Sequence, residues 1–183
     1  MKAMDELSNE HQGVKLMLRV LEELSAKIER GETLKQEHLD GILEFLSVFV
    51  DTCHHGKEED FLFPALEAVG VQNQGGPIGV LLEEHETGRS LVSKIRAASA
   101  SLSEDPAASK AFSTAAREYA MLLAQHIEKE DNVLFPLAET KLNADMDAEL
   151  FESFEHLERE RIGAGKHEAF HKLLEDLVRE YLG

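Results

Sequence analysis

Two short segments of the sequence each place a histidine four residues before a glutamate. The pairs are His54 with Glu58 and His126 with Glu130, and each pair is followed by Leu-Phe-Pro. Four residues make about one helical turn, so both side chains of a pair lie on one face of a helix. Imidazole and carboxylate groups together suit iron, manganese or zinc. The spacing therefore predicts a metal site to which two helices contribute ligands.

Each half of the chain also carries one histidine, His11 or His85, that follows a glutamate and lies on an apolar stripe. The order of these features repeats after roughly seventy residues, which indicates an internal repeat. Folding the two halves about a pseudo-twofold axis would bring six ligands to one place, enough for two metal ions bridged by two carboxylates. The predicted ligands are His11, His54, Glu58, His85, His126 and Glu130.

These residues also have a simpler interpretation. A single histidine on an apolar helix face is often a hydrogen-bonded core residue rather than a ligand. A buried glutamate without a partner is rarer, because its desolvation costs several kcal/mol or more. The duplication of both pairs, with two matched histidines, favours the metal site.

The helices that must position these ligands are predicted by apolar side chains that recur every three or four residues. The segments are 4–30, 35–69, 77–103 and a fourth that follows Pro106 and extends to about residue 137. Proline removes a backbone hydrogen bond, so we expect Pro64 to kink the second helix or end it early; Pro136 has the matching place in the fourth. Short connections predict an all-α, up-down-up-down four-helix bundle.

We expect the C-terminal segment 145–183 to form a fifth helix or a broken helix pair, interrupted at Ile162-Gly163-Ala164-Gly165. Its amphipathic face must cover either an open part of the bundle or a second copy of the chain. We expect residues 1–183 to form one domain, with 1–140 as the metal-binding bundle and 145–183 as its helical extension.

Composition and charge exclude several kinds of partner. The formal net charge of −17 would repel phosphate backbones and anionic lipid surfaces, so we expect neither nucleic acid nor membrane to be a partner. No segment resembles a signal peptide or a membrane span, and Cys53 is the single cysteine, so we expect a cytoplasmic protein. The sequence leaves a monomer and a homodimer equally open.

With these motifs over nearly the whole chain, the sequence resembles the hemerythrin-like, or HHE cation-binding, domains. The family resemblance implies a four-helix bundle around two non-haem iron ions with an oxo or hydroxo bridge. It also implies the six ligands named above, with Glu58 and Glu130 as bridging carboxylates. Manganese or zinc is an alternative metal. The extension resembles the C-terminal helix of bacterial members.

One position departs from the oxygen-carrying members of this family. They have a fifth histidine one turn after the third-helix ligand, where this chain has Arg89. Reversible oxygen carriage is therefore not the expected role. Arg89 should approach the site, where a buried guanidinium needs a carboxylate, and we expect Glu155 or Glu158 of the extension to provide it. The alternative is that Arg89 extends to solvent.

Two further histidine motifs need an interpretation. His55 and Glu59 form a pair one residue out of register, but the repeat has Ile127 opposite His55, so we expect His55 to be an outer or surface residue. His167 and His171 form an H-E-x-x-H pattern, which in zinc proteases needs a third ligand and a cleft. We interpret that pattern as a surface feature of the last helix.

Three functions remain open. The first is binding or sensing of dioxygen or a related small oxidant such as nitric oxide or peroxide. The second is an enzyme of oxidative or nitrosative stress defence, or a protein of iron handling and cluster repair. The third is a structural or storage metal site.

Overall fold

The structure, a computed structural model, describes residues 1–163 and 165–183, and every regular element among them is helical. Segments labelled η are π-helical, with hydrogen bonds that reach five residues back. The elements are α1 (Lys2–Glu29), α2 (Gln36–Glu44), η1 (Phe45–His55), η2 (Glu58–Leu62), α3 (Phe63–Ala68), α4 (Pro77–Ala100), α5 (Pro106–Lys129), η3 (Glu130–Leu134), α6 (Phe135–Lys141), α7 (Ala144–Leu157), η4 (Glu158–Ile162) and α8 (Lys166–Tyr181).

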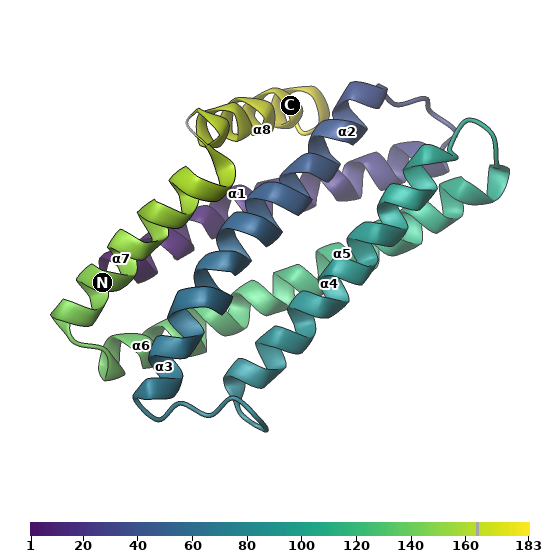
Figure 1. Cartoon of the computed structure of the whole chain (residues 1–183). Helices are drawn as coiled ribbons and strands as arrows, with labels where there is room; N and C mark the ends of the chain where they lie inside the picture. The colour runs from purple at the N-terminus through teal and green to yellow at the C-terminus, as the bar shows by residue number, and fades with distance from the viewer. Residues whose placement is uncertain (164) are drawn as a thin grey trace.

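Four helical arms run alternately up and down, which confirms the predicted bundle (Figure 1). The first arm is α1, the second runs from α2 to α3, the third is α4, and the fourth runs from α5 to α6.

Caps and prolines define several helix starts. Asp105 accepts a hydrogen bond from the backbone N–H of Ala107, with Pro106 in the first turn of α5, and Gly76 precedes Pro77 in α4.

The second and fourth arms continue past their prolines, so of the two outcomes expected at Pro64, a kink or an early end, the early end does not occur. A π-helical segment, η2 or η3, precedes each proline, and Pro64 and Pro136 then lie in the first turns of α3 and α6. A first-turn residue needs no intrahelical acceptor for its N–H group, so the missing proton of proline is tolerated there. The two π-helical segments begin at Glu58 and Glu130, the glutamates of the predicted ligand pairs.

The bundle interior has two apolar regions with a polar layer between them. One cluster, which includes Leu21, Phe45 and Phe112, fills the end near α8, and the other, which includes Leu7, Phe63 and Phe154, fills the end near α7. The buried histidines and glutamates of the predicted site occupy the layer between these clusters. The apolar regions exclude water from both sides of this layer.

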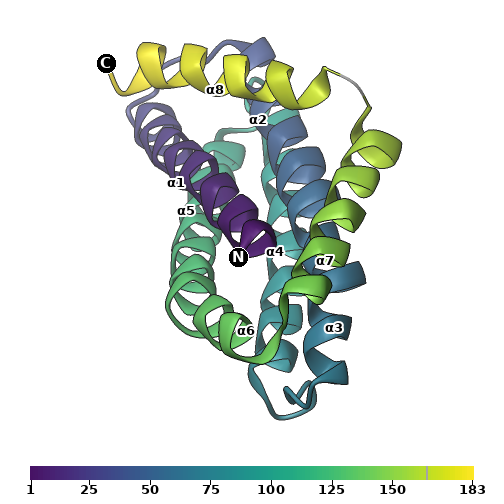
Figure 2. The ribbon, with the colours of Figure 1, turned by 90° about the vertical axis from the view of Figure 1, so that its left-hand side faces the viewer.

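The C-terminal extension is the predicted broken pair, and it covers the side of the bundle formed by α1 and the second arm (Figure 2). Helix α7 runs along α1 and η2, and α8 packs across α1 and η1. The chain turns between them through Gly163 and Gly165, whose φ angles of 87° and 80° favour glycine. Ala164, within the predicted interruption, lies outside the described residues.

None of the helices described here combines the length and the apolar character that a bilayer crossing requires.

Candidate metal centre

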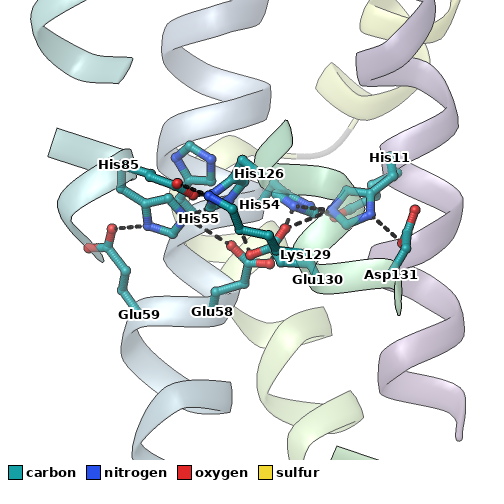
Figure 3. A network of polar contacts seen from close by, with 12 residues as sticks. His11, His54, His55, Glu58, Glu59, His85, His126, Lys129, Glu130 and Asp131 are labelled. Carbon is teal, nitrogen blue, oxygen red and sulfur yellow. Dashed lines mark hydrogen bonds and ion pairs between the residues drawn. The ribbon is translucent and has the colours of Figure 1, made fainter. Parts of the chain in front are cut away.

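The structure brings all six predicted ligands into one layer at the bundle centre, each at most 2% exposed (Figure 3). The histidines form two pairs. The Nε2 atoms of His11 and His54 are 3.1 Å apart, and those of His85 and His126 are also 3.1 Å apart. Each pair comes from one half of the sequence repeat. The pseudo-twofold arrangement expected from the sequence therefore describes the geometry of the layer.

Each glutamate lies between the two histidine pairs. Glu58 places Oε1 3.5 Å from His54 Nε2 and Oε2 3.4 Å from His85 Nε2. Glu130 places Oε2 3.2 Å from His11 Nε2 and Oε1 3.1 Å from His126 Nε2. Each half of the layer thus presents two imidazole nitrogens and one oxygen from each glutamate. Two carboxylates arranged in this way can each bridge two cations.

The carboxylates have no hydrogen-bonding partner for any of their four oxygens, although both glutamates are completely buried. The nearby Nε2 atoms lie at contact distance but without hydrogen-bonding geometry. A buried carboxylate that remains uncompensated costs several kcal/mol. A metal ion in each half would satisfy both oxygens and both imidazoles of that half. The donor set therefore fits a pair of metal ions.

Behind each of the four imidazoles lies a second carboxylate, which accepts a hydrogen bond from Nδ1. The pairs and their Nδ1 to oxygen distances are His11 with Asp131 (2.7 Å), His54 with Glu10 (2.8 Å), His85 with Glu59 (2.6 Å) and His126 with Glu84 (2.9 Å). Such a partner fixes the tautomer, directs Nε2 inward and increases the basicity of the ligand.

A cation completes each of these outer contacts. The donors are Lys15 to Asp131, Lys57 to Glu10, Arg89 to Glu59 and Lys129 to Glu84. The same sequence of imidazole, carboxylate and cation therefore occurs four times around the layer. Neither the outer carboxylates nor the lysines were predicted as site residues. The repeat carried a signal for them, since Glu10 matches Glu84 and Glu59 matches Asp131.

The electrostatics of the layer favour positive charge at its centre. Burial alone would lower the pKa of His11, but the hydrogen bond to Asp131 and the nearby charge of Glu130 outweigh it and raise that pKa to about 9. For His126, the charge of Glu130 outweighs burial and raises the pKa to about 10. Burial would raise the pKa of Glu130, yet His126 and His11 hold it well below its usual value. Protons or metal ions must neutralise the glutamates.

His55 is not a surface residue, which corrects one of the two sequence expectations for it. The residue is 3% exposed, and its ring stacks on His85 with centroids 3.8 Å apart. Its Nδ1 lies 3.4 Å from an oxygen of Asp51, and its Nε2 is buried without a partner. Burial lowers the pKa of His55 well below its usual value, and His85 lowers it further. A neutral fifth imidazole thus belongs to the layer.

Arg89 does not contact Glu155 or Glu158, so the predicted partners are wrong. It lies on α4 and faces the second arm, whereas the extension lies on the other side of that arm. Its Nε donates to Asp51 at 2.8 Å and its Nη2 to Glu59 at 2.7 Å. With 32% of its side chain exposed, Arg89 is neither buried nor extended freely into solvent.

Glu158 lies behind the half of the layer that contains His54, and Glu155 does not. Lys57, fully buried, contacts Glu10 at 2.6 Å and Glu158 at 3.4 Å, which links the extension to the carboxylate behind His54. Glu155 is half exposed, and its ion pair is with Arg159 at 3.8 Å. Of the two glutamates, only Glu158 forms an ion pair with the second arm.

The H-E-x-x-H pattern of α8 lies away from the layer. His167 is 32% exposed with Nδ1 2.9 Å from Glu158, and His171 is exposed. The interpretation as a surface feature of the last helix is consistent with this placement.

This geometry can be compared with known proteins. The model of the hemerythrin HHE cation-binding domain matches residues 2–138, and the chain belongs to this family. An uncharacterized protein of Mycobacterium tuberculosis is 26% identical over 162 residues, which are 88% of this chain and 63% of that protein. The iron-sulfur cluster repair protein YtfE of Salmonella newport is 31% identical over 119 residues, 62% of this chain and 54% of that protein.

The chain thus spans about half to two thirds of the length of these relatives. No solved structure gave a significant match.

Proposed function

We propose that the chain is a non-haem di-iron protein that binds or senses dioxygen or a related small oxidant, nitric oxide or peroxide. The observation that carries the proposal is the buried pair of donor sets, in which both glutamates face both histidine pairs. His11 and His54 would hold one ion, His85 and His126 the other, and Glu58 and Glu130 would bridge them. Manganese or zinc is the alternative metal.

Iron would contribute two accessible oxidation states and the capacity to bind a small molecule. The chain itself controls what surrounds the ions. The four outer carboxylates orient the imidazoles, and the apolar clusters above and below the layer keep water out. A mixed imidazole and carboxylate donor set suits iron in either oxidation state.

A cavity of about 220 Å³ supports access by a small molecule. It lies between η1 and α4 and extends from Arg96 and Arg89 at its rim to Tyr119 and His55. His55 also belongs to the buried layer, so the cavity reaches the neighbourhood of the proposed ions. Its size suits a molecule of two or three atoms with water, and not a large organic substrate.

A second candidate is an enzyme of oxidative or nitrosative stress defence, or iron handling in cluster repair. The similarity to the cluster repair protein YtfE favours it.

The only cysteine of the chain, Cys53, is buried, and burial raises the pKa of its thiol to about 12, which leaves the thiol protonated and unreactive. One buried free thiol fits a reducing compartment, and we propose the cytoplasm.

The experiment that separates these candidates starts from anaerobic, iron-loaded and reduced protein. Titration with dioxygen, nitric oxide and hydrogen peroxide is followed by absorption spectroscopy, and iron release is followed with a chelator. Reversible spectral changes support binding or sensing, whereas repeated consumption of the oxidant supports an enzyme. Oxidant-triggered release of iron supports iron handling. A site whose spectrum ignores all three molecules would contradict the proposal and indicate a structural metal site.

A further inference from the structure

The layer contains five imidazoles, and the family pattern accounts for four of them. His55 is as buried as the others, and one ring nitrogen of His55 belongs to a compact group of potential ligands. One ligand atom from each of His55, Glu58, His85 and His126 lies within 4.8 Å of the other three. His55 is therefore beside the half of the layer that His85 and His126 define.

The hydrogen bonding of His55 follows the pattern of the other four histidines. In each of them Nδ1 contacts a carboxylate and Nε2 is left facing the layer, as described above. His55 has Nδ1 3.4 Å from Asp51, a longer contact of the same kind, and Asp51 in turn accepts from Arg89. An imidazole with its proton on Nδ1 presents a lone pair at Nε2.

That Nε2 atom is buried and has no partner. The other buried side-chain atoms without partners in the layer are the four oxygens of Glu58 and Glu130, which we assign to metal ions. A buried imidazole nitrogen that stays unpaired destabilises the fold, because it has lost its hydrogen bond to water. A metal ion in the adjacent half of the layer would satisfy the nitrogen and the oxygens together.

The matching position in the other half is Ile127, which is buried and cannot bind metal. Together with Val14, Val50 and Leu123, it forms an apolar patch against the histidines of the layer, His55 among them. The two halves are therefore equal in their glutamates and paired histidines, and unequal only beside them. One half has an imidazole where the other has an aliphatic side chain.

We propose that His55 is a fifth imidazole ligand, bound through Nε2 to the ion that His85 and His126 hold. This inference rests on the proposed metal centre and makes its two positions unequal, with three imidazoles at one and two at the other. The ion held by His11 and His54 keeps the position with fewer protein ligands. Arg89, which occupies the position of the missing histidine, acts through Asp51 to position His55.

The test compares cobalt(II) binding to the wild type, to His55→Ile and to His171→Ala by titration calorimetry. Isoleucine is the residue that the other half carries, and His171 is an exposed histidine away from the layer. We expect two binding events in the wild type. In His55→Ile the ion of the His85 half should bind at least about tenfold more weakly, because even the loss of a group that only supports a ligand costs about that much affinity. His171→Ala should match the wild type.

A second measurement needs no variant. In the cobalt-loaded wild type, each metal-bound imidazole contributes one strongly shifted Nδ1–H signal to the proton spectrum, and we expect five such signals. Four signals, or unchanged affinities in His55→Ile, would overturn the role of His55 and leave the metal centre intact. A wild type that binds no metal would overturn both.

Discussion

The two halves of the buried layer have matching histidine pairs and share both glutamates, but their surroundings differ. Behind His54, Lys57 is completely buried under η4, where it contacts Glu6, Glu10 and Glu158. Behind His126, the matching Lys129 contacts Glu84 and is 44% exposed. The extension therefore closes one side of the centre and leaves the other open. The repeat specifies where metal ions would bind, and the departures from the repeat specify how each ion is reached.

The inner surroundings of the two halves also differ. The half beside Lys57 has the aliphatic side chain of Ile127, and the half beside Lys129 has His55 and the cavity under Arg89. A buried metal centre needs both protection from water and a route for its ligand. The chain assigns protection and access to different sides of one symmetric layer.

The largest expected effect comes from a residue that both halves share. Glu130→Ala removes one oxygen from each donor set, so we expect the variant to lose both ions, not one. Metal analysis after loading with ferrous iron and gel filtration should show about two ions per chain in the wild type and fewer than about 0.5 in the variant. Glu128→Ala, an exposed glutamate on the same arm, is the control. Retention of one full ion would show that the carboxylate is not shared.

The pH dependence of the metal-free protein tests one histidine in each half. The pKa values of His11 and His126 in the folded chain are about 9 and about 10, above about 6.5 in the unfolded chain. Both histidines therefore stabilise the fold fully below pH 6.5, and this contribution disappears as the pH rises to about 10.

We expect the free energy of unfolding of the metal-free chain, measured with urea, to fall by several kcal/mol between about pH 6.5 and about pH 10. The metal-bound chain should not lose stability over this pH range, because metal binding requires neutral imidazoles and becomes stronger as the pH rises. His38→Ala, a histidine outside the layer, should keep the full pH dependence. A metal-free chain of constant stability over this range would contradict the electrostatic account.

The two matched lysines test the difference in closure. Lys57→Met leaves the carboxylates of Glu6 and Glu10 without their buried cation, and we expect a loss of about 3 kcal/mol in the free energy of unfolding. Lys129→Met removes a partly exposed cation from Glu84, and we expect a loss below about 1 kcal/mol. Urea unfolding of both variants provides the comparison. Equal losses of unfolding free energy in the two variants would mean that the extension does not isolate the half of the layer that contains His54 from solvent.

Much of the fold follows from local pattern. The periodic apolar positions and the breaks at Gly70 to Gly76 and at Pro106 set the helices to within a few residues. Of the two outcomes expected at Pro64, a kink or an early end, the early end does not occur, because a π-helical segment places that proline at the start of a new α-helical segment. Such a change depends on packing around Glu58 and is not visible in the spacing of apolar residues.

The ligand pairs could be found because the repeat shows them twice. The place of His55 in the layer and the partners of Arg89 could not be predicted from the sequence, for a physical reason. The repeat places Ile127 opposite His55 and so predicts a symmetric layer without His55, whereas His55 is a departure from symmetry. Arg89 was expected to contact the extension, but which arm a helix faces is set by tertiary packing.

The most direct test of the metal centre is anomalous diffraction at the iron absorption edge from crystals of the iron-loaded protein. The account predicts two peaks per chain, one between His11 and His54 and one between His85 and His126, with Glu58 and Glu130 in contact with both. A single peak shared by all four histidines, or no peak within the layer, would contradict it.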